Sequence, residues 1–232
     1  MKSFLWDNGH PSTGDLVCRT GTIFVALLLA ALPVQADQDT DTVYRLDFSD
    51  PAAWQPHNFN KGLTRYTFVR QNSQAVVRAE SRGSASALTR RISVDLNKTP
   101  YLYWSWRVDG VIHNLDERRK SGDDYPARIY IVRNGGWRAW DTIAINYVWS
   151  NNQPPESAWP SAYAAQSMML AVRSGQPEPT RWYHERRNVK QDFKDLLGED
   201  VERVDLIALM TDSDDTRRQA SAWYGEIRFE AN

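Results

Sequence analysis

From residue 43 onward the chain is a succession of short segments rich in β-branched and aromatic residues, separated by turn-forming residues. Such segments predict β-strands, because these side chains pack well on a pleated surface. One helix is predicted over residues 190–197, where Phe193, Leu196 and Leu197 have helical spacing and Gly198 is a typical stop. No helices of about 10–15 residues alternate with the strands. An all-β antiparallel sandwich of jelly-roll type is therefore expected, with a doubly wound α/β fold as the alternative.

The segment boundaries also predict how neighbouring strands pair. A hairpin is expected around Asn134-Gly135-Gly136, a second strand pair around the turn at residues 175–179, and an extended loop over residues 150–166. A single helical turn is expected to begin at Asp50 and Pro51. In the last strand, Trp223, Gly225, Ile227 and Phe229 are expected to face inward. Strands are predicted at residues 43–48, 66–71, 75–81, 88–94, 101–108, 127–133, 139–149, 168–173, 181–188, 201–211 and 223–230.

The N-terminal part has the pattern of an export signal. Residues 22–32 form an apolar run of eleven, Arg19 precedes it, and Pro33-Val34-Gln35-Ala36 follows. The run is shorter than the roughly 20 residues that a membrane-spanning helix needs, but it suits a signal peptide. We expect residues 1–36 to be a signal peptide and residues 37–232 to be one β-sandwich domain in the periplasm or outside the cell. An uncleaved membrane anchor is the alternative.

Composition excludes several classes of function. The formal net charge is −1, and the basic residues are scattered in pairs among acidic ones, so no cationic field favours nucleic acid. The only cysteine, Cys18, lies within the expected leader. The exported domain would therefore have no disulfide, no cysteine nucleophile and no cysteine-based metal site, and its core alone must stabilise it.

One turn carries paired charges directly into a strongly β-prone segment. Asp123 and Asp124 follow Gly122, and Arg128 begins the predicted strand at residues 127–133. Loops that end in a rigid strand often carry binding groups, so the two carboxylates are candidates for binding a sugar hydroxyl or a cation. Aspartates in such turns also bond to their own backbone, and Arg128 would then close an ion pair across the turn. We expect one aspartate to serve a ligand and the other to serve the fold.

A second acidic segment contains Asp212, Asp214 and Asp215, which supply the oxygen ligands that Ca²⁺ prefers. The spacing does not match an EF-hand, because the required glycine and glutamate are missing. A solvated turn neutralised by Arg217 and Arg218 would have the same composition. A calcium ion at these three aspartates is therefore one expectation, although no cofactor is required.

The chain is rich in tryptophan and tyrosine, with ten of each. Flat aromatic rings stack on the C–H faces of sugars, but aromatic side chains also supply much of a protein core. Trp137, Trp140 and Trp159 lie in or beside polar turns and are the better candidates for exposure, whereas Trp149 lies within a predicted strand.

Hydrolysis of a glycoside needs two carboxyl groups about 5–9.5 Å apart. Asp123 or Asp124 together with Glu185 could supply them, although the spacing in sequence does not determine that distance. His57, His113 and His184 are well separated, and no Gly-x-Ser-x-Gly motif is present, so zinc-dependent and serine hydrolases are disfavoured.

Four segments resemble the bacterial family catalogued as domain of unknown function 3047. They are Gly122-Asp123-Asp124-Tyr125-Pro126-Ala127-Arg128, Asn146-Tyr147-Val148-Trp149, Glu185-Arg186-Arg187-Asn188-Val189, and Met210 to Asp214 through Ala222-Trp223-Tyr224-Gly225. The likeness extends from about Tyr44 to Phe229 and implies no established activity. The opening Leu46-Asp47-Phe48 with Trp54, and the closing Trp223 to Ile227, are also similar to the ends of galactose-binding-like jelly rolls of carbohydrate-binding modules.

A non-catalytic binding module for a polar ligand such as a glycan is therefore expected. A hydrolase of cell-envelope carbohydrate and a structural partner-binding protein are the alternatives. The expected ligand-binding residues are Asp123, Asp124, Arg128, Trp137, Trp140, Asn146, Trp149, Trp159, Glu185 and Arg187.

Overall fold

The computed structural model describes residues 43–136 and 141–232. The expected leader at residues 1–36, together with Trp137 and Trp140, lies outside this part of the chain. Within the described part, no helix is both long and apolar enough to cross a membrane.

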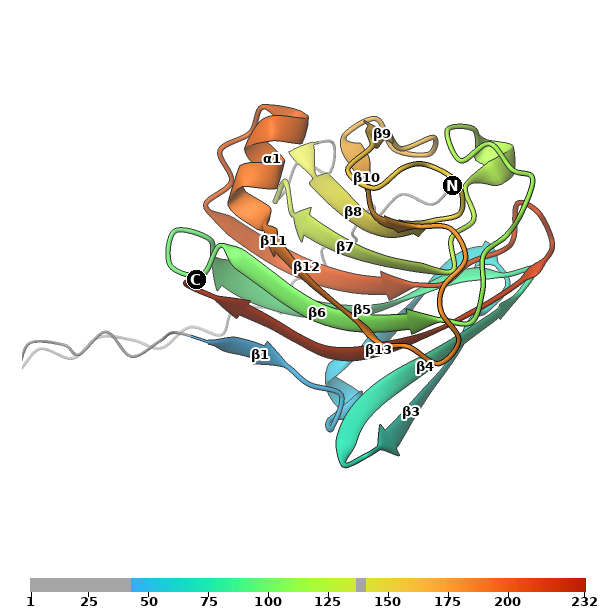
Figure 1. The fold of residues 1–232 in the computed structure, drawn as a ribbon. Helices are drawn as coiled ribbons and strands as arrows, with labels where there is room; N and C mark the ends of the chain where they lie inside the picture. Colours follow the sequence, from blue (N-terminus) through green and yellow to red (C-terminus); the bar gives the residue numbers. More distant parts are fainter. Residues whose placement is uncertain (1–42, 137–140) are drawn as a thin grey trace, which may run out of the picture.

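Two β-sheets stack face to face, as predicted for a jelly-roll-like sandwich (Figure 1). The first has six strands in the order β11 (Tyr183–Asn188), β6 (Tyr101–Val108), β13 (Gln219–Glu230), β4 (Gln74–Arg82) and β3 (Arg65–Gln71), with β1 (Tyr44–Leu46) also beside β13. The second has seven, in the order β2 (Gln55–Lys61), β5 (Ala85–Asp95), β12 (Arg203–Met210), β7 (Ala127–Arg133), β8 (Ile143–Ser150), β10 (Ser167–Ser174) and β9 (Ala158–Pro160). Among the described strands all pairs are antiparallel except β8 with β10.

The helices lie where local signals placed them. Pro51–Ala53 (η1) is a single 3₁₀ turn, and the Asp50 carboxylate accepts the amide of Ala52. Val189–Leu197 (α1) begins after Asn188, whose side chain accepts the amide of Gln191, and ends at Gly198 with φ of 73°. Glycine adopts this left-handed conformation without steric cost, which is why it is a common helix stop. Both predictions are confirmed.

Aromatic side chains fill the space between the sheets. Trp104 stacks on Tyr147 with ring centroids 5.3 Å apart, and Trp106 meets Trp149 edge-on at 6.0 Å. Each pair joins a strand of the six-stranded sheet to β8 of the seven-stranded sheet. Truncating a buried aromatic side chain to alanine typically costs about 3–5 kcal/mol, so these ring pairs contribute strongly to the stability of the core.

One predicted pairing is wrong, and two strands were missed. The strands β10 and β11 were expected to pair around the turn at residues 175–179, but β10 pairs with β8 and β9, whereas β11 pairs with β6 in the other sheet. The segment between them crosses from one sheet to the other. Residues 150–166 were expected to be loop throughout, but they include β9, which forms an edge of the seven-stranded sheet. Strand β2 was also missed, because Gln55–Lys61 consists mostly of polar residues and has no β-branched residue.

A β-bulge reverses the expected facing in the first half of β13. The register against β6 shifts between Tyr224 and Ile227, so Tyr224 is buried inward and Trp223 faces outward. Ile227 and Phe229 face inward as expected. Gly225 lies in the bulge, where an added Cβ would approach Trp182 Cζ3 at 3.1 Å. A strict alternation of inward and outward residues cannot anticipate an inserted residue.

Gly122 determines how the loop that carries Asp123 and Asp124 approaches the sheet. It ends a short 3₁₀ helix, Lys120–Gly122 (η2), and an added Cβ would lie 2.7 Å from the carbonyl carbon and 2.8 Å from the amide nitrogen of Asp116. We predict that Gly122→Ala lowers the free energy of unfolding by about 1–3 kcal/mol, because backbone atoms must move.

The measurement is the free energy of unfolding in urea, compared between Gly122→Ala and a control variant, Gly110→Ala. The Cβ added at Gly110 would lie at an ordinary contact distance of 3.5 Å from Gln176 Nε2. Equal stability of the two variants would contradict the close approach at Gly122.

Candidate functional site

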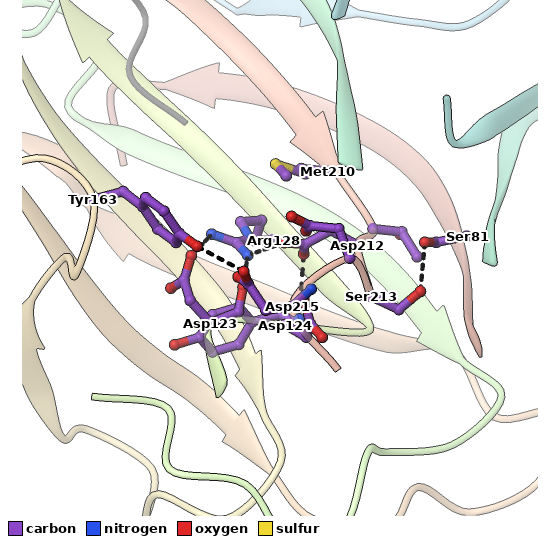
Figure 2. Close-up of polar contacts among 12 residues, drawn as sticks. Ser81, Asp123, Asp124, Arg128, Tyr163, Met210, Asp212, Ser213 and Asp215 are labelled. Carbon is purple, nitrogen blue, oxygen red and sulfur yellow. Dashed lines mark hydrogen bonds and ion pairs between the residues drawn. The ribbon is translucent and has the colours of Figure 1, made fainter. Parts of the chain in front are cut away.

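A buried arginine at the start of β7 organises the candidate site (Figure 2). Arg128 is 2% exposed, and its Nη2 donates to Asp212 Oδ2 at 2.5 Å and to the carbonyl oxygen of Asp123 at 2.9 Å. Its Nη1 lies 3.6 Å from Asp123 Oδ2 and donates to the Tyr130 hydroxyl at 3.0 Å. The guanidinium also lies 4.4 Å from the centre of the Tyr125 ring. The predicted ion pair across the turn is therefore present, and Asp212 is an additional member.

The charges in this network stabilise one another. Burial alone would lower the pKa of Arg128, but Asp212, Tyr130 and Asp123 raise it well above the ordinary value. Arg128 is therefore a permanent cation in the interior. A buried cation without partners would cost several kcal/mol, so the carboxylates of Asp212 and Asp123 are required to hold Arg128 in the fold.

Tyr224 connects this network to the opposite sheet. Its hydroxyl donates to the Met210 carbonyl oxygen at 2.7 Å and accepts the Arg128 amide at 3.3 Å. Thr211 Oγ1 lies 2.9 Å from the same hydroxyl and donates to the Pro126 carbonyl oxygen at 2.8 Å. Burial raises the pKa of Tyr224, which stays neutral. The start of β7 and the end of β12 are therefore held at a defined height above β13.

Asp124 serves the fold, as expected for one member of the pair. Its carboxylate is fully buried and accepts the backbone amides of Asp215 at 3.1 Å and Thr216 at 2.7 Å. These bonds tie the loop that precedes β7 to the loop that follows β12. The Asn151 side chain fastens the first loop from the other side, donating to the Asp124 carbonyl oxygen at 2.8 Å.

Glu117 was not recognised from the sequence. It is fully buried and accepts the Ser150 hydroxyl at 2.5 Å, the Asn151 amide at 2.6 Å and the Asn151 side chain at 2.9 Å. Ile112 also donates its amide to Asn151 Oδ1 at 2.7 Å. Glu117 and Asn151 thereby position the charged loop. No local signal marks Glu117, because it lies in a strongly charged stretch that is typical of solvated loops.

Three carboxylates converge beside this network, but they are not the three that the sequence suggested. Oxygens of Asp124, Asp214 and Asp215 lie within 4.8 Å of one another, whereas Asp212 is held by Arg128 and by the Tyr125 amide at 3.2 Å. Their donor type suits a hard cation, which takes 6–8 oxygen ligands. Asp124 already accepts two amides, and Asp215 accepts the Tyr163 hydroxyl at 2.6 Å. The three groups would thus supply part of a calcium shell.

Asn146 and Trp159 lie on the same outer face of the seven-stranded sheet as Arg128. Tyr130 faces Asn146 in the register of β7 with β8, and Met169 lies between Asn146 and Trp159 in the next two pairings. Asn146 is 1% exposed and Trp159 is 2% exposed. Asn146 Nδ2 donates to Ser167 Oγ at 2.6 Å, but Asn146 Oδ1, Trp159 Nε1 and Arg128 Nε have no hydrogen-bond partner among the described residues.

The other expected ligand-binding residues lie elsewhere. Trp149 faces the core, and its indole N–H donates to the Gly175 carbonyl oxygen at 2.9 Å. Glu185 is on β11, where it accepts the Trp106 indole N–H at 2.9 Å and pairs with Arg173. No hydrogen bond or ion pair within the described ranges joins Glu185 to Asp123 or Asp124.

Arg187 holds the helix rather than lying on the outer face. It donates to both oxygens of Asp192 on α1, at 2.7 and 3.0 Å, and pairs with Glu156 at 2.8 Å. Asp192 in turn accepts the Tyr147 hydroxyl at 2.7 Å, and burial followed by the Asp192 charge raises the pKa of Tyr147. These contacts make Arg187 a link between β11, α1 and β8.

Comparison with solved structures finds distant likenesses. A family 11 carbohydrate-binding module from Clostridium thermocellum, in complex with a β-1,3-1,4-mixed-linked tetrasaccharide, is 10% identical, with 82% of this chain and 96% of that chain covered and a TM-score of 0.47. The mannan-recognising module TmCBM27 is 12% identical, with 82% and 99% covered and a TM-score of 0.38. Endoglucanase 3 of family GH12 from Trichoderma harzianum is 12% identical, with 84% and 99% covered and a TM-score of 0.42. At these identities and TM-scores the likeness carries no conclusion about this chain.

A search of curated proteins returns no match. The family model described as "Protein of unknown function (DUF3047)" matches residues 52–228. That match includes every strand from β2 to β12 and most of β13, and with them the whole Arg128 network. The chain belongs to the DUF3047 family, as its sequence motifs indicated.

Proposed function

We propose that the protein is an exported, non-catalytic binding module that holds a polar ligand, such as a glycan, on the outer face of the seven-stranded sheet. The observation that carries this proposal is the set of three buried polar atoms on that face without a hydrogen-bond partner among the described residues. They are Arg128 Nε, Asn146 Oδ1 and Trp159 Nε1. Leaving a buried polar group unsatisfied costs about 1–3 kcal/mol, so three on one face favour a partner outside the fold.

The chemistry of the three atoms suits hydroxyl groups. Arginine and indole N–H groups only donate, whereas the amide oxygen of asparagine only accepts. A sugar hydroxyl both donates and accepts, so a chain of hydroxyls satisfies all three atoms without carrying charge. The rings of Tyr130 and Trp159 on the same face add flat apolar surfaces of the kind on which sugar C–H groups pack.

Apolar side chains, several of them alanines, surround these groups on the same face. Ala208 faces Tyr130 in the register of β12 with β7, Ala144 faces Val132, and Ala171 faces Val148. Arg128 itself lies between Met210 of β12 and Val148 of β8, and Asn146 lies between Tyr130 of β7 and Met169 of β10. Arg128 is itself held rigidly by Asp212 and Asp123, and a preorganised donor loses little entropy when a ligand binds.

A hydrolase remains the second possibility from the sequence. Its two proposed carboxylates, however, accept hydrogen bonds in different parts of the sandwich. Glu185 accepts an indole N–H within the six-stranded sheet, whereas Asp124 accepts two backbone amides beside β7. A non-catalytic module is the function that this arrangement favours.

Binding is tested by thermal shift and calorimetry of the purified protein with neutral tetrasaccharides of glucose, mannose and galactose and with soluble peptidoglycan fragments, with and without Ca²⁺. We expect a dissociation constant in the micromolar range for at least one of these probes and no release of new reducing ends. Absence of binding to every probe, or turnover of any of them, would contradict the proposal.

A matched pair of tryptophan variants tests which face binds. Trp159→Phe and Trp149→Phe remove the same part of the ring, but only Trp149 loses a hydrogen bond, to Gly175. We predict that Trp159→Phe weakens binding of the identified oligosaccharide about fivefold to tenfold, because one donor is lost. Trp149→Phe should leave the affinity unchanged and be about 1 kcal/mol less stable than Trp159→Phe in urea unfolding. Equal affinity of the two variants would place the ligand elsewhere.

A further inference from the structure

The outer face of the six-stranded sheet is built differently from the face just described, because arginines alternate with aromatic rings across it. The Arg107 guanidinium lies 4.5 Å from the centre of the Trp223 ring and 5.7 Å from that of Trp182. On the other side of Trp223, Arg78 lies 5.4 Å from the same ring. The register of β6, β13 and β4 aligns Arg107, Trp223 and Arg78 in one row across the sheet.

A second row repeats the arrangement nearer the other end of the strands. Arg186 lies 3.9 Å from the centre of the Tyr101 ring, and Arg228 lies 4.5 Å from that of Tyr103. Arg186 also donates to the Tyr103 hydroxyl at 2.7 Å. An arginine stacked on an aromatic ring presents the edge of its guanidinium in a fixed plane, a geometry that matches a carboxylate.

Positive charge is in excess on this face, although the whole chain has a net charge of −1. Seven arginines and four carboxylates share it, by strand register and by position on adjoining residues. The arginines are Arg45, Arg65, Arg78, Arg82, Arg107, Arg186 and Arg228, and the carboxylates are Asp109, Glu80, Glu226 and Glu230. The charge is therefore unevenly distributed over the molecule, and this face complements an anionic partner.

Some donors on the face are not used within the fold. Arg107 Nε and Arg78 Nε have no hydrogen-bond partner among the described residues, although Arg107 Nε lies 4.0 Å from Asp109 Oδ1. The Arg107 side chain is only 12% exposed, so the two rings and the sheet hold it in place. Gly225 helps to fix the position of Trp182, because the absence of a Cβ lets the edge of the Trp182 ring approach β13.

We propose that this arginine–aromatic face binds an acidic polysaccharide, with guanidinium groups taking the carboxylates and the rings contacting the sugar faces. The rows of rings favour a glycan over a lipid surface, since the one large apolar side chain that is exposed in residues 43–136 and 141–232 is Leu63, in the turn before β3. A duplex nucleic acid carries one charge per about 1.7 Å of its axis, so the intervening glutamates oppose it more strongly than a polysaccharide with one carboxylate per sugar ring. The site is separate from the proposed neutral-ligand face and does not depend on it.

Polygalacturonate and its methyl ester are the probes, because they have the same sugar backbone with and without charge. Calorimetry of the intact protein at low salt should show binding of polygalacturonate that weakens as salt is added, and binding of the methyl ester at least about tenfold weaker. Equal binding of the two polymers, or no binding of either, would overturn the proposal. Tighter binding of phosphatidylglycerol vesicles or duplex DNA than of polygalacturonate would also overturn it.

Variants locate the contact. Arg107→Gln and Arg186→Gln should each weaken polygalacturonate binding about tenfold, because each removes a charge-assisted hydrogen bond. Arg119→Gln is the matched control, since Arg119 is 79% exposed and pairs with Asp116 in the loop before β7. The control should bind like the original protein, and the exposed Arg186 allows the test even if Arg107→Gln folds poorly. Unchanged binding by Arg186→Gln would contradict the assigned surface, whatever the outcome for neutral tetrasaccharides.

Discussion

The buried cation Arg128 is the constraint on which the candidate ligand-binding face depends. A guanidinium that is 2% exposed must be surrounded by acceptors, because removing an unpaired charge from water costs several kcal/mol. Asp212 comes from the end of β12, Asp123 from the loop before β7, and Tyr130 from β7 itself. The requirement of one side chain thereby brings three segments together, and the Tyr224 hydroxyl attaches the group to the opposite sheet.

Two further buried carboxylates hold the loops around the Arg128 network in place. Asp124 joins the loop before β7 to the loop after β12 through backbone amides, and Glu117 joins the same loop to the end of β8. A buried acceptor that receives several donors gains more than any single pair, since each remaining lone pair is satisfied. Buried hydrogen bonds therefore fasten the loops above the seven-stranded sheet to one another and to the end of β8.

The two outer faces of the sandwich differ in chemistry although both lie over the same aromatic core. On the seven-stranded sheet, apolar side chains such as Met210, Val148 and Met169 surround a few buried polar groups. On the six-stranded sheet, arginines such as Arg107 lie between aromatic rings such as Trp182 and Trp223. The first arrangement suits a neutral ligand rich in hydroxyl groups, and the second suits an anionic one. Under the two proposals, a single domain presents two binding surfaces of different preference, one on each side of its core.

The sequence by itself determined the sandwich, its helix and the ion pair at Arg128, because these follow from local side-chain patterns and from charges close together in the chain. Only the tertiary structure decided which carboxylates meet: Asp124 joins Asp214 and Asp215, whereas Asp212 joins Arg128. It also decided that Trp149, Glu185 and Arg187 support the core and helix, and that the bulge at Gly225 turns Trp223 outward. The reason is physical, since the face to which a side chain points depends on strand register, and register is established between segments far apart in the chain.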